Sequence, residues 1–458
     1  MNGGAPVPTS GLRGRSRLRW VAALAALLLI AVACSKKSPT TNTPGGSAAA
    51  GTTIPQATVK FGYYPCCADH AIFTVAAKKG FFRDVGIKLD PPEGHLYTVF
   101  DQITPSMQRG DFNIAATFVQ GYLQTLATFG QNIPPILFHD IYVGYAILKA
   151  PDSPAKTTEE LMGTGLSFRD AAKQAVAQLK GQTVYTPPHG QVQPPYPSVF
   201  LAYAGLKYPS DLKLQFLEDT KIVELSAQAG RVEFAIPYAA PVLVQMLRNG
   251  YKPIIDTQQV LNNDVGSAEF KQMTKLVGSS GLMAQRSWVE KNTDTAMRFI
   301  SAIYRTLHFL GDPATQQEGW KIEADIINAT QGLRLIPEDI GVIFRDIDPL
   351  FPWEDQGPKL WDDPSAQFYV EGSLKIQIQS LIDDGTLPNK QYDIRGFLVA
   401  KDLFEKMKAL QTEAKGLLSK GDSAGLSGAK ADLLKKAHQY YDWYDFLDAV
   451  RFAKAATA

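Results

Sequence analysis

Segments with strand-like and helix-like apolar spacing alternate from residue 57 onward. "TVKFGYY" (58–64) and "DFNIAATF" (111–118) are typical of buried strands, whereas "HAIFTVAAKKGFF" (70–82) and "VQGYLQTLATFG" (119–130) have helical spacing. Strands that alternate with helices indicate parallel β-α-β units. The sequence therefore predicts an α/β fold.

The second third of the chain repeats this plan. "RGDFNIAATFVQGYLQTLATFG" (109–130) and "AGRVEFAIPYAAPVLVQMLRNG" (229–250) both read Gly-x-apolar-polar-apolar-Ala, then a helix, then Gly. Two lobes built on one plan explain this repeat, and a chance match is the alternative. Between the two copies, "PPILFHDIYVGYAILKAP" (134–151) holds two apolar runs, which we expect to cross between the lobes.

The N-terminus has the features of a secretory signal. Four arginines within residues 13–19 precede the apolar run "VAALAALLLIAVA" (21–33) and Cys34. The run is shorter than the ~20 residues that a membrane-spanning helix needs. Residues 1–33 carry four of the positive charges and no acidic residue, so their removal changes the formal net charge from +1 to −3.

This composition gives no electrostatic reason to expect a nucleic-acid partner. The sequence also lacks the zinc-protease motif H-E-x-x-H and the phosphate-binding P-loop motif. We therefore expect no enzyme activity, no catalytic residues and no cofactor.

The segment "AVAC" (31–34) resembles the lipobox of bacterial lipoproteins, with Ala31 where leucine is usual. This resemblance implies that Cys34 is lipidated, and the alternative is a plain secretory signal with an incidental cysteine. The Ser/Thr/Gly/Pro-rich residues 35–56 are suited to a flexible tether. We expect an exported protein that is anchored by lipid to the outer face of the cell membrane or in the periplasm.

Residues 57–408 resemble the substrate-binding proteins of ABC importers in the nitrate, sulfonate, bicarbonate and thiamine-precursor group. The similarity is carried by the order of "VKFGYYP…HAIFTVAAKKGFFRDVGIKLD", "LKGQTVYTPPHG" (179–190), "GRVEFAIPYAAP" and "GSSGLMAQRSWVEKNTDTAMRFISAIYRTLHFL". It implies a two-lobed periplasmic-binding-protein type II fold with two crossing strands and a ligand cleft between the lobes. It also implies a small-molecule ligand, partner permease and ATPase subunits, and a monomer.

The resemblance and the patterns together predict the following organisation. We expect a signal peptide (1–33), a lipidated cysteine and tether (34–56), the first part of lobe 1 (57–145), lobe 2 (146–255), a return to lobe 1 with C-terminal helices (256–408) and an additional helical tail (409–458).

In such folds the ligand lies beyond the carboxyl ends of the strands, where helix N-termini point. In lobe 1 this predicts contacts from Tyr63 or Tyr64, which face opposite sides of a strand, and from Cys66, Cys67, Asp69, His70, Phe118 and Gln120. Asp69 has a second interpretation as a helix cap, and His70 as a surface or capping residue. In lobe 2 it predicts His189, Gln191, Tyr196, Ser198 and Tyr238.

Two adjacent cysteines, Cys66 and Cys67, follow the first strand, and a third is expected to carry lipid. They are consistent with a disulfide between neighbours, with two reduced, half-buried thiols, or with a soft-metal site that includes His70. A metal-binding lipoprotein is therefore one alternative function. A second is an enzyme similar to the thiamine-pyrimidine synthase of fungi, although "CCADH" matches its cysteine-rich motif poorly.

The predicted site is aromatic and polar and contains no lysine or arginine. It favours a neutral or flat organic solute, such as a heteroaromatic ring, while nitrate, bicarbonate or a sulfonate could still bind at helix N-termini. The tail contains "HQYYDWYDFLDAVRFAKA" (438–455), with aromatic residues at helical spacing. We interpret it as a helix that packs on the globular body, with a docking face for a partner as the alternative.

Overall fold

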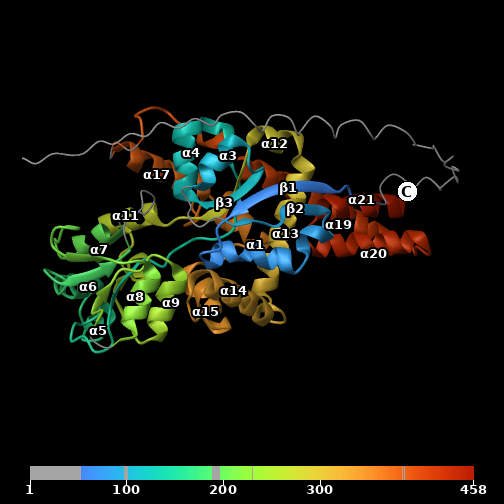
Figure 1. Ribbon diagram of the computed structural model, residues 1–458. Helices are drawn as coiled ribbons and strands as arrows, with labels where there is room; N and C mark the ends of the chain where they lie inside the picture. Colours follow the sequence, from blue (N-terminus) through green and yellow to red (C-terminus); the bar gives the residue numbers. More distant parts are fainter. Residues whose placement is uncertain (1–52, 97–101, 188–195, 229–230, 384, 386) are drawn as a thin grey trace, which may run out of the picture. The chain divides into compact units, whose positions relative to one another are not determined.

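The computed structural model describes residues 53–96, 102–187, 196–228, 231–383, 385 and 387–458. In these residues two mixed β-sheets are covered by helices (Figure 1), so the expected α/β fold is confirmed. No helix among them is long and apolar enough to cross a membrane. The predicted signal peptide and Cys34 lie outside the described residues.

The first sheet has the strand order β2-β1-β3-β10-β4. Strands β1, β2 and β3 are parallel, whereas β10 is antiparallel to both β3 and β4. Buried apolar side chains on both faces, such as the neighbours Ile114 and Ala115 on β3, place this sheet in the core of lobe 1. The strands are β1 (Ala57–Tyr63), β2 (Ile87–Leu96), β3 (Ile114–Phe118), β4 (Pro135–Phe138) and β10 (Ser280–Ala284).

The second sheet has the order β7-β6-β8-β5-β9, with β6 parallel to β7 and β8, and β5 antiparallel to β8 and β9. In each sheet the first three parallel strands lie in the order second-first-third, and an antiparallel strand follows. The two similar sequence segments contain the third strand of each set, so the repeat reflects one plan used twice. The strands are β5 (Ala146–Lys149), β6 (Thr183–Thr186), β7 (Lys213–Phe216), β8 (Phe234–Ala235) and β9 (Lys252–Asp256).

Two segments connect the sheets, one between β4 and β5 and the other between β9 and β10. They meet where the backbone N–H of Tyr142 donates to the carbonyl oxygen of Gly278, at 2.7 Å. A third segment lies beside the first, because the N–H of Val143 donates to the carbonyl of Ile347, at 2.8 Å. The expected crossing within 134–151 is therefore confirmed, and it forms one strand in each sheet.

Helices follow the strands of each sheet and cover them (Figure 1). Those of lobe 1 before the first crossing are α1 (Ala68–Lys78), α2 (Phe81–Asp84), α3 (Ile103–Arg109) and α4 (Val119–Phe129). Those of lobe 2 and the second crossing are α5 (Thr158–Met162), α6 (Phe168–Ala177), α7 (Tyr196–Ala202), α8 (Asp219–Ser226), α9 (Ala240–Arg248), α10 (Thr257–Asn263) and α11 (Ala268–Leu276).

After β10 the described chain is mainly helical. Helix α13 is buried over most of its length, with Phe299 packed against Phe61 and Phe82. The helices are α12 (Arg286–Lys291), α13 (Thr293–Gly311), α14 (Gln316–Gln331), α15 (Pro337–Val342), α16 (Trp353–Asp355), α17 (Val370–Asp383) and α18 (Ile394–Phe397), with π-helical turns at Ile343–Ile347 and Gln356–Trp361.

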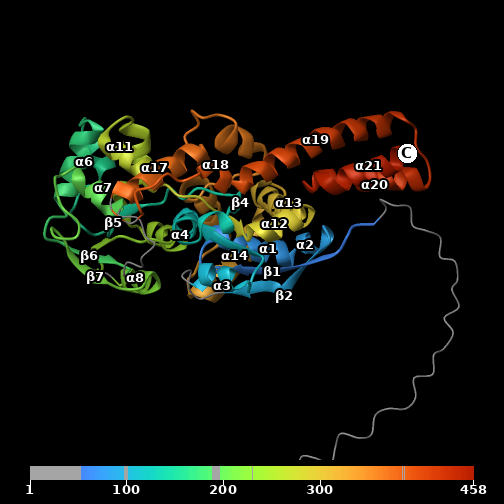
Figure 2. The same ribbon diagram turned by 90° about the horizontal axis from the view of Figure 1, so that it is seen from above.

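The C-terminal tail is helical, as expected. Helix α19 (Val399–Ser423) runs through the predicted boundary at residue 409 without a break, and α20 (Ala429–Asp442) and α21 (Phe446–Thr457) pack against it (Figure 2). The expected single helix over 438–455 is divided by a turn in which Tyr444 has a positive φ of 62°.

The aromatic face of the tail packs on the body, as interpreted from the sequence. The guanidinium group of Arg305 lies between the rings of Phe81 and Trp443, at 4.1 and 4.0 Å from their centroids. The hydroxyl group of Tyr440 donates to the backbone carbonyl of Asp84, at 2.9 Å. These contacts occupy the face that could otherwise have bound a partner.

Candidate functional site

A cavity of about 440 Å³ lies between the two lobes. Its wall includes the residues that follow the carboxyl ends of β1, β3, β6 and β8, and residues of the crossing segments. Ligands of open α/β sheets bind at such strand ends. The volume lies within the range of small-molecule sites, roughly 300–1,000 Å³.

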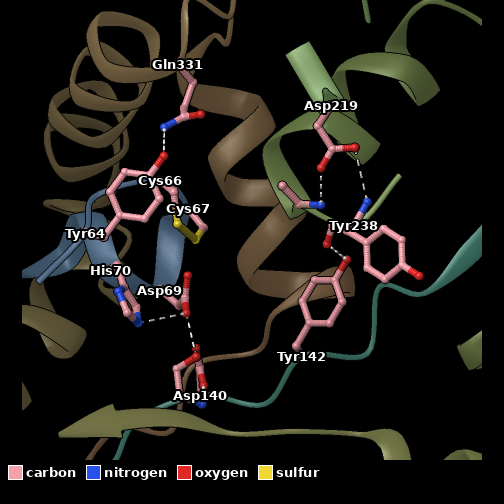
Figure 3. Close-up of a disulfide and its surroundings, with 12 residues drawn as sticks. Tyr64, Cys66, Cys67, Asp69, His70, Asp140, Tyr142, Asp219, Tyr238 and Gln331 are labelled. Carbon is pink, nitrogen blue, oxygen red and sulfur yellow. Dashed lines mark hydrogen bonds and ion pairs between the residues drawn. A yellow bond between two sulfur atoms is a disulfide. The ribbon is translucent and has the colours of Figure 1, made fainter. Parts of the chain in front are cut away.

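The wall from lobe 1 is formed by the turn between β1 and α1. Tyr64 directly follows β1, and its hydroxyl oxygen accepts a hydrogen bond from Nε2 of Gln331, at 3.0 Å (Figure 3). Its neighbour Tyr63 points into the core, where its hydroxyl contacts Thr74 Oγ1 at 2.7 Å. Burial raises the pKa of Tyr63 to about 12. Alternation along the strand therefore assigns Tyr64 to the cavity.

Cys66 and Cys67 are joined by a disulfide bond that lines the cavity. Cys67 also occupies the N-cap position of α1. Because both sulfur atoms are bonded to each other, neither is a thiolate, and a thiolate is the form that binds metal. The structure therefore contradicts the alternative soft-metal site of Cys66, Cys67 and His70, and it favours the disulfide among the three interpretations of the pair.

The wall from lobe 2 is formed by the first residues of α8 and by the turn before α9. The carboxylate of Asp219 accepts hydrogen bonds from the backbone N–H groups of Tyr238 and Ala239, at 3.4 and 3.2 Å (Figure 3). Desolvation by the surrounding protein raises the pKa of Asp219 to about 7. Glu218 and Pro187 lie at the edge of this wall.

The first crossing segment contributes two tyrosines. The hydroxyl group of Tyr142 donates to the backbone carbonyl of Tyr238, at 2.9 Å, and so connects the crossing segment to lobe 2. The ring of Tyr145 lies edge-on to that of Tyr142 and stacks on Tyr196, with centroids 4.8 and 4.4 Å apart. These contacts fix the orientation of the two rings before any ligand binds.

Three buried carboxyl groups, which we call the acidic cluster, lie at the base of the cavity: Asp69, Asp140 and Asp348. One oxygen of each lies within 4.8 Å of the others. Asp69 and Asp348 line the cavity, whereas Asp140 lies behind them. Ser280 connects two members, because its hydroxyl donates to Oδ2 of Asp69 at 2.5 Å and its backbone N–H donates to Asp140. Burial and mutual repulsion raise the pKa of both Asp140 and Asp348 well above the usual range.

The nearby histidines do not balance this charge. His70 Nε2 is 3.6 Å from Asp69 Oδ2, but burial lowers the pKa of His70, so that contact is not an ion pair near neutral pH. Burial likewise lowers the pKa of His139 to about 4. A fourth carboxyl group, Glu323, is fully buried, and its pKa is raised well above the usual range by burial and by Asp69.

The structure brings together about half of the residues predicted from the sequence. Those that line the cavity are Tyr64, Cys66, Cys67, Asp69, Phe118 and Tyr238. His189 and Gln191 lie outside the described residues, and Gln120 lies in the first turn of α4 with its side chain not described.

Four predicted residues lie elsewhere, and their assignment to the site is corrected. Tyr63 packs in the core, and His70 is completely buried behind Asp69. Tyr196 is completely buried behind Tyr145, and its hydroxyl donates to the carbonyl of Pro237 at 2.9 Å. Ser198 lies on the exposed face of α7. In each case the strand or helix turns the side chain away from the cavity.

Sequence reasoning missed the lining residues that lie outside the repeated strand–helix units. They come from the crossing segments, the start of α8, the end of α14 and the loop after Ile347, and they include Tyr142, Tyr145, Glu218, Asp219, Gln331 and Asp348. Two signals were present in the sequence: the tyrosines within "DIYVGYA" and the acidic, aromatic loop "DIDPLFPWEDQ".

The sequence matches no protein-family model and no curated protein. Similar solved structures include the periplasmic aliphatic sulphonate binding protein SsuA from Escherichia coli (TM-score 0.47, 16% identity, 74% of this chain and 91% of SsuA covered). Another is the periplasmic nitrate-binding protein NrtA from Synechocystis PCC 6803 (TM-score 0.48, 15% identity, 78% and 90% covered). The desulfurization enzyme DSZB is also similar (TM-score 0.48, 12% identity, 77% and 99% covered).

These neighbours thus include periplasmic binding proteins for a sulphonate and for nitrate, together with one enzyme. At this level of similarity they carry no information about what the present chain binds. The ligand must be inferred from the residues of the cavity itself.

Proposed function

We propose that this chain is the extracytoplasmic solute-binding lipoprotein of an ABC importer and captures a small organic solute. The observation that carries the proposal is the cavity, whose wall combines side chains from two similar lobes and from the segments that connect them. A site divided in this way responds to the distance between the lobes, which is the property used in capture by hinge closure.

The connecting segments support such a motion. The backbone hydrogen bond Tyr142–Gly278 joins them to each other, and the bonds Val143–Ile347 and Ile141–Pro349 join the first of them to the third segment. Small changes in backbone dihedral angles within 139–145 and 277–279 would rotate one lobe against the other while both sheets stay intact. Tyr142 lies at this hinge and contacts lobe 2 through its hydroxyl group. This contact would stabilise the closed arrangement of the lobes.

The side chains of the cavity wall indicate which chemical class of solute binds there. Aromatic rings and the disulfide provide flat apolar surfaces, and tyrosine hydroxyls, Gln331 and carboxyl groups provide polar contacts. A heteroaromatic solute of the thiamine-precursor type fits this wall. Sulfonate, nitrate and bicarbonate would meet four carboxyl groups and no lysine or arginine among the described lining residues, so we leave these anions out of the proposed ligands.

The place of action is proposed from the sequence. The basic region, the apolar run and Cys34 support export followed by lipid anchoring to the membrane surface. An anchored monomer would deliver its solute to a permease with its ATPase subunits in the same membrane.

Equilibrium dialysis of the full chain, extracted in detergent, against a metabolite extract of the producing cells tests the proposal. We expect one or a few compounds to be enriched with the protein and recovered chemically unchanged after denaturation. A compound that is converted during dialysis would instead support an enzyme, and the absence of any enriched compound would contradict the proposed receptor.

A further inference from the structure

We propose that the solute is an organic cation, whose positive charge is carried by nitrogen and which is small and flat enough to lie between aromatic rings. This inference deepens the proposed function and rests on it. Four properties of the cavity support it: the charge of its wall, the state of its helix N-termini, the acidic cluster and the aromatic rings.

The first property is the charge of the wall. Carboxyl groups of Asp69 and Asp348 line one side of the cavity, and those of Glu218 and Asp219 line the other. The described lining contains no lysine or arginine. In their ionised state these carboxyl groups repel an anionic solute and attract a cation, and in their protonated state none of them offers an anion a positive charge.

The second property is that carboxylates of the protein already lie at the helix N-termini that face the cavity. The backbone N–H groups before α9 donate to the carboxylate of Asp219. Asp69 lies in the first turn of α1. Helix N-termini attract anions through their unpaired N–H groups and partial positive charge. At α9 the carboxylate of Asp219 satisfies that attraction, and at α1 the carboxyl group of Asp69 lies in the first turn without a capping hydrogen bond, so an anionic solute would meet an acidic side chain at either end.

The third property is an excess of buried acid. The three carboxyl groups of the acidic cluster are nearly completely buried, and Oδ1 of Asp69 has no hydrogen-bond partner among the described residues. Both oxygens of Glu323, whose charge acts on Asp69, are likewise without a described partner. Buried like charges must share protons or be balanced by a cation. A nitrogen that donates hydrogen bonds to Asp69 and Asp348 would supply both the charge and the missing donors.

The fourth property distinguishes an organic cation from a metal ion. The rings of Tyr64, Phe118, Tyr142 and Tyr238 line the rest of the cavity. Aromatic faces attract cations within about 6 Å of the ring centroid. A bare metal ion at the acidic cluster would leave most of the 440 Å³ unfilled and would not contact these rings.

The test separates a metabolite extract of the producing cells by cation exchange. The retained fraction, which contains the cations, and the flow-through fraction are each added to the full chain in detergent, with EDTA present. We expect the retained fraction to raise the Tm by about 3 °C or more and the flow-through to have no effect. Calcium, magnesium and manganese chlorides, tested separately without EDTA, are expected to have no effect.

Variants connect the effect to the cavity. Asp69→Asn keeps the acceptor for Ser280 and removes one charge, and should weaken binding from the retained fraction about tenfold or more. Glu218→Gln changes an exposed residue that does not support the fold, and should weaken binding about twofold to fivefold. Asp346→Asn is the matched control, because Asp346 pairs with Arg345 outside the cavity, only two residues before Asp348.

The outcomes separate the two levels of the proposal. A Tm rise with the flow-through alone overturns the cationic ligand but leaves the receptor standing. A rise only with a metal chloride, or an equal loss in Asp346→Asn and the cavity variants, also overturns the cationic ligand. No rise with either fraction overturns the proposed receptor itself.

Discussion

The carboxylate of Asp219 accepts a hydrogen bond from the backbone N–H of Ala239, at 3.2 Å. An acidic side chain of the protein therefore occupies the N-terminus of α9. Two helices are thereby joined at the wall of the cavity. The groups that face Asp219 are the carboxyl group of Glu218 and the hydroxyl groups of Tyr142, Tyr196 and Tyr238. None of them carries a positive charge.

This arrangement predicts a pH dependence of solute binding. The pKa of Asp219 is about 7, so its carboxylate gains a proton as the pH falls from 8 to 6 and the wall loses negative charge. We expect cations from the retained fraction to bind more weakly at pH 6 than at pH 8, measured by calorimetric titration. In Asp219→Asn this part of the pH dependence should be absent. An identical pH profile in both proteins would contradict the assignment.

The buried Glu323 predicts a pH dependence of stability with a definite sign. Its pKa is raised in the folded protein, so its contribution to folding is complete below about pH 4.5 and is lost as the pH rises through the folded value. Glu323→Gln cannot ionise. We therefore expect the free energy of unfolding of Glu323→Gln, minus that of the original protein, to be larger at pH 8 than at pH 5. Urea unfolding at both pH values measures this difference.

Glu318→Gln on the same helix is the control for that comparison, because Glu318 is exposed and pairs with Lys79 at the surface. Its difference from the original protein should be nearly independent of pH. If the stability difference of Glu323→Gln is as independent of pH as that of Glu318→Gln, the pKa of Glu323 is not raised in the folded protein.

At Gly281, next to Ser280, we expect the addition of a single methyl group to lower the stability of the protein strongly. A Cβ at this position would collide with the backbone carbonyl of Leu137 on β4 and would lie 2.8 Å from the hydroxyl of Tyr122. Gly281→Ala should reduce the free energy of unfolding by about 2 kcal/mol or more. Gly416→Ala, at an exposed position within α19 with nothing within 4 Å, should instead increase it by about 0.5–1 kcal/mol. Similar effects of the two substitutions on urea unfolding would contradict this account.

The sequence predicted what depends on local order along the chain. Tyr64, Asp69 and Phe118 were found because each follows a strand whose apolar pattern is clear. Asp348 and Gln331 were missed because their distance from β1 along the chain exceeds 250 residues, and only the packed arrangement of α14 and the crossing segments brings them to the cavity. The orientation of His70 could not be predicted either, since a helix turn decides whether a side chain faces the cavity or the core.

The tail illustrates the same limit. Its aromatic face predicted packing on the body, but the partner of Asp448 could not be read from the sequence. In the structure, Asp448 accepts a hydrogen bond from Nε of Arg298 on α13, at 2.6 Å, and both side chains are almost completely buried.

This buried pair predicts that the tail stabilises the body. Arg298→Met removes one partner and leaves the charge of Asp448 only partly balanced by Arg451, so the free energy of unfolding should fall by about 3 kcal/mol. Glu413→Gln removes an exposed pair with Lys454 in the same tail and should have no measurable effect. Urea unfolding of both variants checks this. Equal stabilities would show that the tail does not depend on the buried pair.

The most direct test of the central claim is native mass spectrometry of the full chain, purified from producing cells in detergent without reductant. We predict a noncovalent organic adduct that is absent or strongly reduced in Asp69→Asn, on a chain two hydrogens lighter than its reduced form because of the Cys66–Cys67 disulfide. An original protein that carries no adduct, or that carries only a metal ion, would contradict a cavity that captures an organic solute.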